Sequence, residues 1–294
     1  MRAYLRTCTP DQIYIASGPW DGQTDRVNRR GSYLADALVG QVPLIHEAMF
    51  AGVRKLLFIA SHQVYGRCAV LPIAEEDLAQ ARPDHVREPL VVAHLAGIRL
   101  CEAYMHEYGE ALGLAYRSVV AGHAYGPGGT TDPASTCELL CLVRHIHQAK
   151  EAGLAKVNIR SNGLRRGDWI HVDDLAEACI RLLGLSPRQH GRLTHAERPH
   201  INLGSGEPNT TEQLAQTVAR VVGYRGQLQL DGSSDNEGSD FFLDTRRIRS
   251  TGWKPQVALE AGIATVYRDY LMRVKKQRPR PVPTSRAPLI RVRE

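Results

Sequence analysis

The sequence predicts an α/β protein built around a parallel sheet, and two observations support this fold class. Short apolar runs rich in β-branched residues alternate with longer segments whose apolar residues recur every three or four positions. Glycine and proline turns separate the two kinds of segment. Strands that alternate with helices form parallel sheets, because each helix returns the chain to the start of the next strand.

The first half of the chain shows this alternation clearly. The expected elements are a strand at 12–16, a helix at 33–51, a strand at 55–61, a helix at 91–108, a strand at 114–120 and a turn at 125–129. Gly52 and Gly109 follow the two helical patterns and are expected to end them, since glycine readily adopts the left-handed conformation of a helix terminus.

Capping signals organise the second half. Asp173 is expected to cap a helix over 174–183. Thr210 begins a Thr-x-x-Gln capping box for a helix over 211–222. The Gly-Ser-Gly at 204–206 is predicted to be a turn and not a phosphate loop, because the third glycine of such a loop is missing.

Composition limits the classes of protein. The 294 residues are 43% hydrophobic, which is enough for one large or two modest domains with a core. No apolar run approaches the roughly 20 residues of a membrane span, and the start lacks the apolar core of a signal peptide. Six cysteines without a Cys-x-x-Cys pair favour reduced thiols. We expect a cytoplasmic protein that does not bind membranes.

The positive charge lies at one end of the chain. Residues 275–294 contain seven basic residues and one acidic residue, which accounts for the whole formal charge of +6. We expect this proline-containing tail to be solvated and without a fold, and the neutral body not to bind nucleic acid. Weak binding of the tail to RNA, an anionic membrane or an acidic partner is the alternative.

Four segments resemble the GDP-L-fucose synthase family of extended short-chain dehydrogenases. They are RKLLF at 54–58, AGIRLCEAY at 96–104, WIHVDDL at 169–175 and LAQTVARVVGY at 214–224. The resemblance implies a truncated Rossmann-like domain over 1–160 and a smaller, interleaved C-terminal domain of the substrate type over 161–274, before the tail at 275–294.

The family's cofactor is not expected to bind. Members epimerise a GDP-4-keto-6-deoxymannose at C3 and C5 and then reduce it with NADPH at C4. Their chains open with a strand and a glycine-rich turn that hold the dinucleotide pyrophosphate. By this resemblance the strand at 12–16 corresponds to a later strand of the family's sheet. The first two β-α units are then absent, and no cofactor is expected.

The residues that the family uses for acid–base chemistry are mostly replaced. Its Tyr and Lys correspond to Leu90 and His94, and its Cys corresponds to Gln63. Leucine cannot exchange a proton. Ser61 is retained, and Cys137 occupies the position of the epimerase histidine. Ser61 and Cys137 are therefore the candidate catalytic residues.

The family's substrate-binding cations are also displaced. Two arginines of the family correspond to His145 and Gly167, and its late lysine corresponds to Phe241. Arg144 and Arg166 lie one position away from the two arginine positions and are the candidates for binding a GDP-sugar.

Cys137, Cys141 and His145 follow one another at intervals of four residues. On a straight helix the first and third side chains would lie about 12 Å apart, too far for one zinc ion, so we expect no metal site. Alternatively, Cys137 alone could shuttle a proton in a cofactor-free epimerase if Arg144 or His145 lowered its pKa.

His62 lies beside Ser61 in the sequence. Its imidazole is expected either to be exposed or to have its hydrogen bonds satisfied in the core.

These patterns predict a catalytically degenerate homologue of GDP-L-fucose synthase that acts as an accessory subunit. The helix at 91–108 keeps its apolar stripe, and in the family this helix helps to form the dimer interface. We expect a homodimer, or a heterodimer with a full-length paralogue, formed through this helix. The alternative is an active nucleotide-sugar epimerase or reductase with altered site residues, or with a wrongly assigned start. A third hypothesis is an adaptor that uses the basic tail.

Overall fold

The computed structural model describes residues 2–8, 10–16, 29–66, 70–80, 88–129, 137–195, 199–232 and 240–277. The predictions for the tail at 275–294 therefore fall almost entirely outside the described residues. Within the described part of the chain, no helix is long and apolar enough to cross a bilayer.

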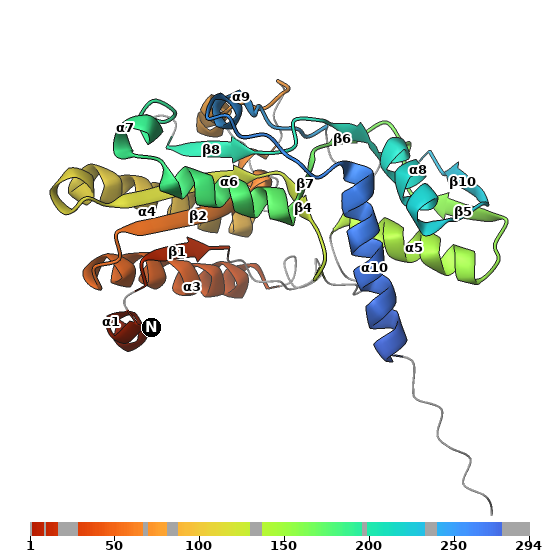
Figure 1. The fold of residues 1–294 in the computed structure, drawn as a ribbon, viewed down its shortest axis with the longest axis horizontal. Helices are drawn as coiled ribbons and strands as arrows, with labels where there is room; N and C mark the ends of the chain where they lie inside the picture. The colour runs from red at the N-terminus through yellow and green to blue at the C-terminus, as the bar shows by residue number, and fades with distance from the viewer. Residues whose placement is uncertain are drawn as a thin grey trace, which may run out of the picture.

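A four-stranded parallel sheet forms the main lobe (Figure 1). Its strands, in spatial order, are β1 (Gln12–Ile15), β2 (Lys55–Ser61), β3 (Ala115–Ala121) and β8 (His200–Leu203). All three pairings are parallel, as the alternation of strands and helices predicts. The α/β fold class is confirmed, and the segments at 12–16, 55–61 and 114–120 form strands within one residue of the predicted bounds.

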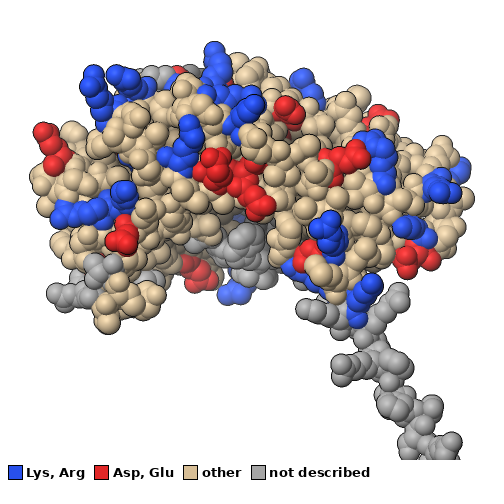
Figure 2. Space-filling view, viewed as in Figure 1, with Lys and Arg blue, Asp and Glu red and all other residues tan. Residues whose placement is uncertain are grey.

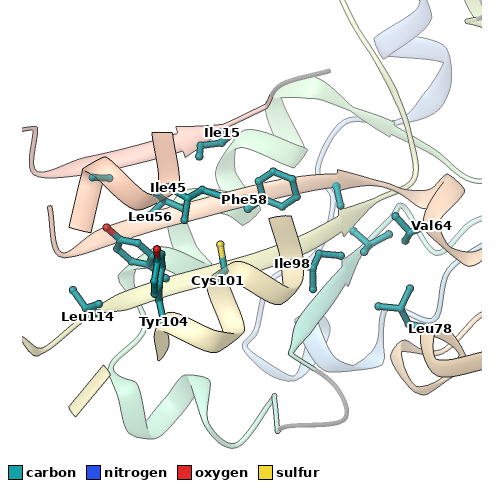
Figure 3. Packing of buried hydrophobic residues seen from close by; sticks show 14 of the residues in the cluster. Ile15, Ile45, Leu56, Phe58, Val64, Leu78, Ile98, Cys101, Tyr104 and Leu114 are labelled. Carbon is teal, nitrogen blue, oxygen red and sulfur yellow. The ribbon is translucent and has the colours of Figure 1, made fainter. Parts of the chain in front are cut away.

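Helices cover both faces of this sheet, because successive side chains of a strand point to opposite faces. Leu56 and Phe58 of β2 pack in one cluster with α3 (Arg30–Phe50) and α4 (Glu88–Leu112) (Figure 3). Leu57, between them, packs in another cluster with α6 (Val172–Gly184).

The helix α4 approaches the sheet closely at Gly97. A Cβ atom at this position would lie 2.3 Å from the ring of Phe58, so only glycine allows the contact. The prediction that Gly109 ends the helix is wrong, because α4 continues to Leu112 and Gly113, with φ +62°, follows it. A single glycine is tolerated inside a helix at a cost of about 1 kcal/mol.

A second lobe packs beside the sheet, with the long helix α10 at the junction (Figure 1). Its elements are α5 (Glu138–Glu151), β5 (Lys156–Ile159), α8 (Thr211–Val222), β10 (Gln227–Leu230) and α10 (Leu259–Gln277). One apolar cluster joins α5, β5, α8 and α10. The sequence-based division places 137–159 in the first domain, but these residues pack here. The capping box at Thr210 is confirmed by the hydrogen bonds at the start of α8.

Short elements complete the described structure. They are α1 (Arg2–Cys8), η1 (His62–Tyr65), η2 (Glu75–Gln80), β4 (His123–Tyr125), β6 (Arg166–Gly167), β7 (Trp169–His171), α7 (Pro187–His190), β9 (Asn209–Thr210) and α9 (Arg246–Ser250). β4 pairs with β7 in parallel, and β6 pairs with β9 antiparallel.

On the face drawn in Figure 2, basic and acidic side chains are interspersed.

The N-terminus of α6 corrects a sequence-based prediction. The helix begins at Val172, and the imidazole of its N-cap residue His171 accepts a hydrogen bond from the Asp173 amide. Asp173 is exposed, whereas Asp174 is buried and accepts hydrogen bonds from the amides of Gln256 and Val257. The prediction that Asp173 is the cap was wrong because the helix begins before Asp173, which lies in its first turn.

Candidate functional site

The candidate site lies at the carboxyl ends of β2 and β3, where parallel α/β proteins bind ligands. Ser61 is the last residue of β2 and caps η1, with its hydroxyl accepting a hydrogen bond from the Gln63 amide at 3.3 Å. Gln63 extends from the same short helix. Its side-chain oxygen is buried and has no hydrogen-bond partner among the described residues.

The two α4 residues that the resemblance places at the positions of the family's Tyr and Lys are both buried. Leu90 is only 7% exposed and offers no polar group. His94 is 6% exposed, and its Nδ1 accepts a hydrogen bond of 2.9 Å from the Ser61 amide. A nitrogen that accepts this bond carries no proton, so the ring proton lies on Nε2 when the imidazole is neutral. His94 therefore anchors the end of β2 to α4.

Four aromatic rings meet beside Ser61. The imidazoles of His62 and His123 have ring centroids 4.1 Å apart, and the Phe241 ring lies 4.4 Å from that of His62. The ring of Trp169 lies 5.7 Å from that of His123. Both imidazoles are half-buried, whereas Phe241 and Trp169 are buried. The expectation that His62 is exposed or satisfied in the core did not include this stacking, and His123 was not a candidate.

Sequence reasoning missed the imidazole pair because nothing local brings the two residues together. His62 follows β2, and His123 begins β4 after the Gly122 connection. One sequence feature could have indicated the pair: both histidines follow predicted strands, and the carboxyl ends of parallel strands lie at the same edge of the sheet.

Backbone hydrogen bonds to two other segments hold the Phe241 segment at the site. The Phe241 amide donates to the Arg166 carbonyl, and the Ile73 amide donates to the Phe242 carbonyl. Arg166 itself is paired with Asp240 at 2.8 Å. Burial opposes the charged Asp240 carboxylate, but the hydrogen bonds and charge of Arg166 lower its pKa overall. Arg166 thus already has a carboxylate partner.

The position of the family's second arginine is closed by packing. Gly167 is buried, and a Cβ atom there would lie 2.6 Å from the indole of Trp169. An arginine at this position would collide with the buried indole of Trp169 unless that ring moved.

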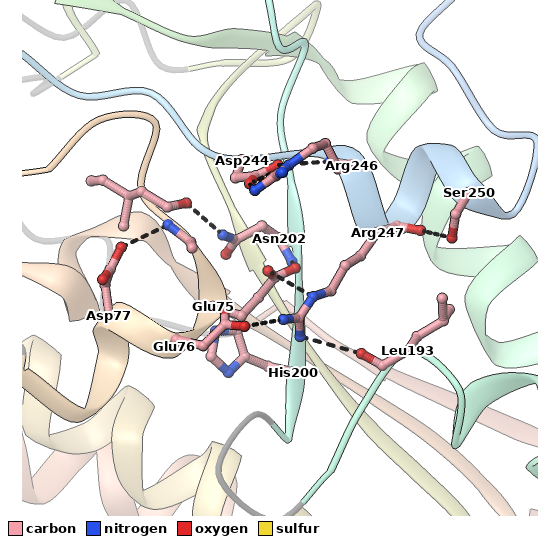
Figure 4. Close-up of polar contacts among 12 residues, drawn as sticks. Glu75, Glu76, Asp77, Leu193, His200, Asn202, Asp244, Arg246, Arg247 and Ser250 are labelled. Atoms are coloured by element: carbon pink, nitrogen blue, oxygen red, sulfur yellow. Dashed lines mark hydrogen bonds and ion pairs between the residues drawn. The ribbon is translucent and has the colours of Figure 1, made fainter.

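A buried polar network holds η1 and η2 against β8 and α9. Figure 4 shows its contacts between η2, β8 and α9. The Tyr65 hydroxyl contacts His200 Nε2 at 2.7 Å and donates to Asn202 at 2.5 Å. The Asn202 amide donates to Glu75, which is paired with Arg247 at 3.3 Å. Burial and the nearby Arg247 charge lower the pKa of His200 to about 3, so the ring is neutral at pH 7. This network positions the end of η1.

The segment at 204–206 follows β8 and bends at Gly206, and its amides bind an anion that belongs to the chain itself. The fully buried Asp168 carboxylate accepts hydrogen bonds from the Ser205 amide at 2.7 Å, the Ser205 hydroxyl at 2.5 Å and the Gly206 amide at 3.3 Å. Burial raises the pKa of Asp168, although these hydrogen bonds oppose the increase. The turn amides are therefore not available to a phosphate.

Cys137 and Arg144 lie in the second lobe, at the N-cap and on the body of α5. Burial raises the pKa of the Cys137 thiol, and the same cause raises the pKa of Cys141 even though Arg144 opposes it. His145 is exposed and contacts the Asn158 carbonyl at 3.0 Å. Cys137 is therefore protonated at neutral pH, and the reactive thiolate that a proton-shuttling Cys137 requires is not stabilised.

The parallel sheet, the second lobe and the polar edge of β2 define an α/β protein of the extended short-chain dehydrogenase class. A model of the NAD dependent epimerase/dehydratase family matches residues 1–204, and the chain belongs to this family. It is 33% identical over 261 residues to the GDP-L-fucose synthase of Escherichia coli K12, covering 89% of this chain and 80% of that protein. It is 34% identical to GDP-L-fucose synthase 1 of Arabidopsis thaliana, covering 80% and 68% of the two chains.

Solved structures show the same fold. A GDP-D-glycero-L-gluco-heptose synthase of Campylobacter jejuni, crystallised in the presence of NADPH, matches with a TM-score of 0.83 and 25% identity over 92% of this chain and 85% of that chain. A GDP-mannoheptose C4 reductase of the same organism with NADP bound matches with a TM-score of 0.78 and 26% identity, covering 92% and 84% of the two chains.

The described residues do not fit the dinucleotide of these neighbours in the family's manner. By the resemblance, Leu90 and His94 stand at the positions of the two family groups that face the nicotinamide end, and His94 is bound to the Ser61 amide. The amides of the 204–206 segment are bound to Asp168. The described imidazoles at this edge are suited to moving protons.

Proposed function

We propose that the chain acts on a GDP-linked 4-keto sugar and exchanges the proton on a carbon next to the ketone, without reducing the ketone. One observation supports this proposal: the chain is similar to GDP-L-fucose synthases over most of its length, and by this resemblance Leu90 stands at the position of the proton donor of the reduction. Exchange of a proton beside a ketone requires only acid–base groups, whereas reduction also requires a hydride donor. No cofactor is expected.

The GDP moiety is proposed to bind near Arg144 and Arg166. Arg144 is half-buried on α5, and Arg166 can exchange its Asp240 partner for a phosphate. Replacing Arg144 by Gln should weaken GDP binding about tenfold or more in calorimetry, since a hydrogen bond to a charged group contributes about 1.5–3 kcal/mol. Arg225→Gln, at an exposed position in the second lobe, is the control.

The proposed reaction is tested by incubating the purified chain with GDP-4-keto-6-deoxymannose, with and without NADPH. Nuclear magnetic resonance and mass spectrometry of the product should show a sugar of unchanged mass in ordinary water, and NADPH should not be consumed. Oxidation of NADPH with a reduced sugar as product would overturn the absence of reduction. Failure to bind any GDP-sugar in calorimetry would overturn the proposed function as a whole.

A second candidate is a non-catalytic subunit that pairs through α3 and α4. The outer surface of this helix pair carries exposed apolar side chains, including Val39 and Val92. The proposed partner is a second copy of this chain. In this case the protein binds its partner but exchanges no proton with a keto sugar.

A further inference from the structure

The imidazoles of His62 and His123 occupy the place where a ligand at this sheet would be contacted. His62 begins η1 directly after β2, and His123 begins β4 directly after the turn that follows β3. β2 and β3 are neighbours in the parallel sheet, so their carboxyl ends open onto the same edge. Both rings are half-buried and 4.1 Å apart, close enough to act on one ligand.

Each imidazole is held by its backbone and by its neighbours. The His123 amide donates to the Asp168 carbonyl, and the residue is paired in register with Trp169. His62 is held by η1, which Tyr65 anchors to β8. The Phe241 ring packs against His62. Rings fixed in this way are preorganised, as proton transfer to a bound ligand requires.

The other candidate groups near this edge have different roles. His94 accepts a hydrogen bond from the Ser61 amide and anchors α4 to β2. Burial raises the pKa of the Cys137 thiol, which makes it a poor base. Imidazole is the side chain best suited to accept and return protons near neutral pH.

We propose that His62 and His123 are the acid–base pair of this site. This inference rests on the proposed function. One neutral imidazole accepts the proton from the carbon next to the ketone. The C–H electron pair becomes the C=C bond of an enolate, and the carbonyl electron pair moves onto oxygen. The imidazolium exchanges its proton with solvent, and return of a solvent-derived proton to carbon restores the ketone and the neutral ring. Nothing is oxidised or reduced.

The two ring centroids lie 4.1 Å apart, so both imidazoles can contact the same part of one ligand. The rings are too close to enclose a sugar between them, so they approach it from one side. The pair therefore accounts for exchange of the proton on one face of the sugar, and inversion at that carbon requires a proton donor on the opposite face.

The test is uptake of deuterium from heavy water into GDP-4-keto-6-deoxymannose, followed by mass spectrometry and proton resonance. The wild-type chain should introduce deuterium next to the ketone without NADPH. His62→Asn and His123→Gln should each slow this uptake about 100-fold or more, while GDP-sugar binding in calorimetry changes by less than about threefold. His106→Gln, at an exposed position on α4, should leave the rate unchanged.

A second pair of variants distinguishes a catalytic role from a structural one. Adding free imidazole should restore part of the deuterium uptake in His62→Gly and His123→Gly, but a merely misfolded site would not respond. Uptake that persists in both histidine variants overturns this inference and leaves the proposed function in place. A wild-type chain that binds the GDP-sugar without any uptake overturns both this inference and the proposed proton exchange, and leaves only the proposed binding of a GDP-sugar. A chain that binds no GDP-sugar overturns both.

Discussion

At the scale of single residues, buried side chains hold the loops around the site in place. Asp168 is the clearest case, because a fully buried carboxylate receives two amides and a hydroxyl of the 204–206 turn. It also lies next to Gly204, where a Cβ atom would come within 2.1 Å of the carboxylate oxygen. The turn and the carboxylate therefore fit each other closely, and neither can change alone.

Replacing Asp168 by Asn should destabilise the protein by about 2–3 kcal/mol. The amide nitrogen of Asn would face hydrogen-bond donors, and a buried donor without a partner costs the free energy of its desolvation. Urea denaturation followed by circular dichroism measures this loss.

Asp173→Asn is the matched control for that substitution. It makes the same chemical change at a side chain that is 82% exposed, and the free energy of unfolding should change by less than about 0.5 kcal/mol. Equal effects of the two variants would contradict the role assigned to the Asp168 carboxylate.

At the scale of elements, helix ends show how far local sequence determines structure. The Thr210 capping box was predicted from four residues and forms as expected, since all of its hydrogen bonds are local. The cap at His171 was missed, because the sequence pattern favours Asp173 and does not reveal the orientation of a side chain from the preceding strand. The continuation of α4 past Gly109 has a similar cause: packing against β3 outweighs one unfavourable residue.

Replacing Thr210 by Ala should lower the free energy of unfolding by about 1 kcal/mol. The substitution removes the hydroxyl that accepts the hydrogen bond from the Gln213 amide at 3.1 Å. Thermal denaturation of Thr210→Ser, which keeps the hydroxyl, should retain most of the stability. If Ser and Ala destabilise α8 equally, the hydrogen bond is not the cause.

At the scale of the whole molecule, the sequence predicted the sheet far better than the site. The run at 55–61 was placed correctly because burial on both faces leaves a continuous apolar pattern. The contact between His62 and His123, and that between Phe241 and His62, join segments distant in the chain. No periodicity encodes which loops meet at a sheet edge, so these contacts could not be predicted.

The proposed pairing of two copies is also tested at this scale. Val39 is 73% exposed on α3 and Val92 is 41% exposed on α4. Val39→Glu and Val92→Glu should each weaken self-association at least about 100-fold, because an unpaired carboxylate would be buried between the copies. Light scattering coupled to gel filtration should show a dimer for the wild type and a monomer for both variants.

Ile180→Glu provides the control for the pairing test. Ile180 is 62% exposed on α6, which packs on the opposite face of the sheet from α3 and α4. This variant should remain dimeric. A wild-type chain that is monomeric at micromolar concentration would contradict the pairing itself.

The hydrogen bond between His94 and the Ser61 amide makes lysine, the residue that the family resemblance places at this position, costly here. Lysine at position 94 has only donors, so it would leave that amide unsatisfied and would bring a charge into a position that is 6% exposed. His94→Lys would therefore loosen the end of β2. A stable chain with this lysine would require at least one compensating change elsewhere.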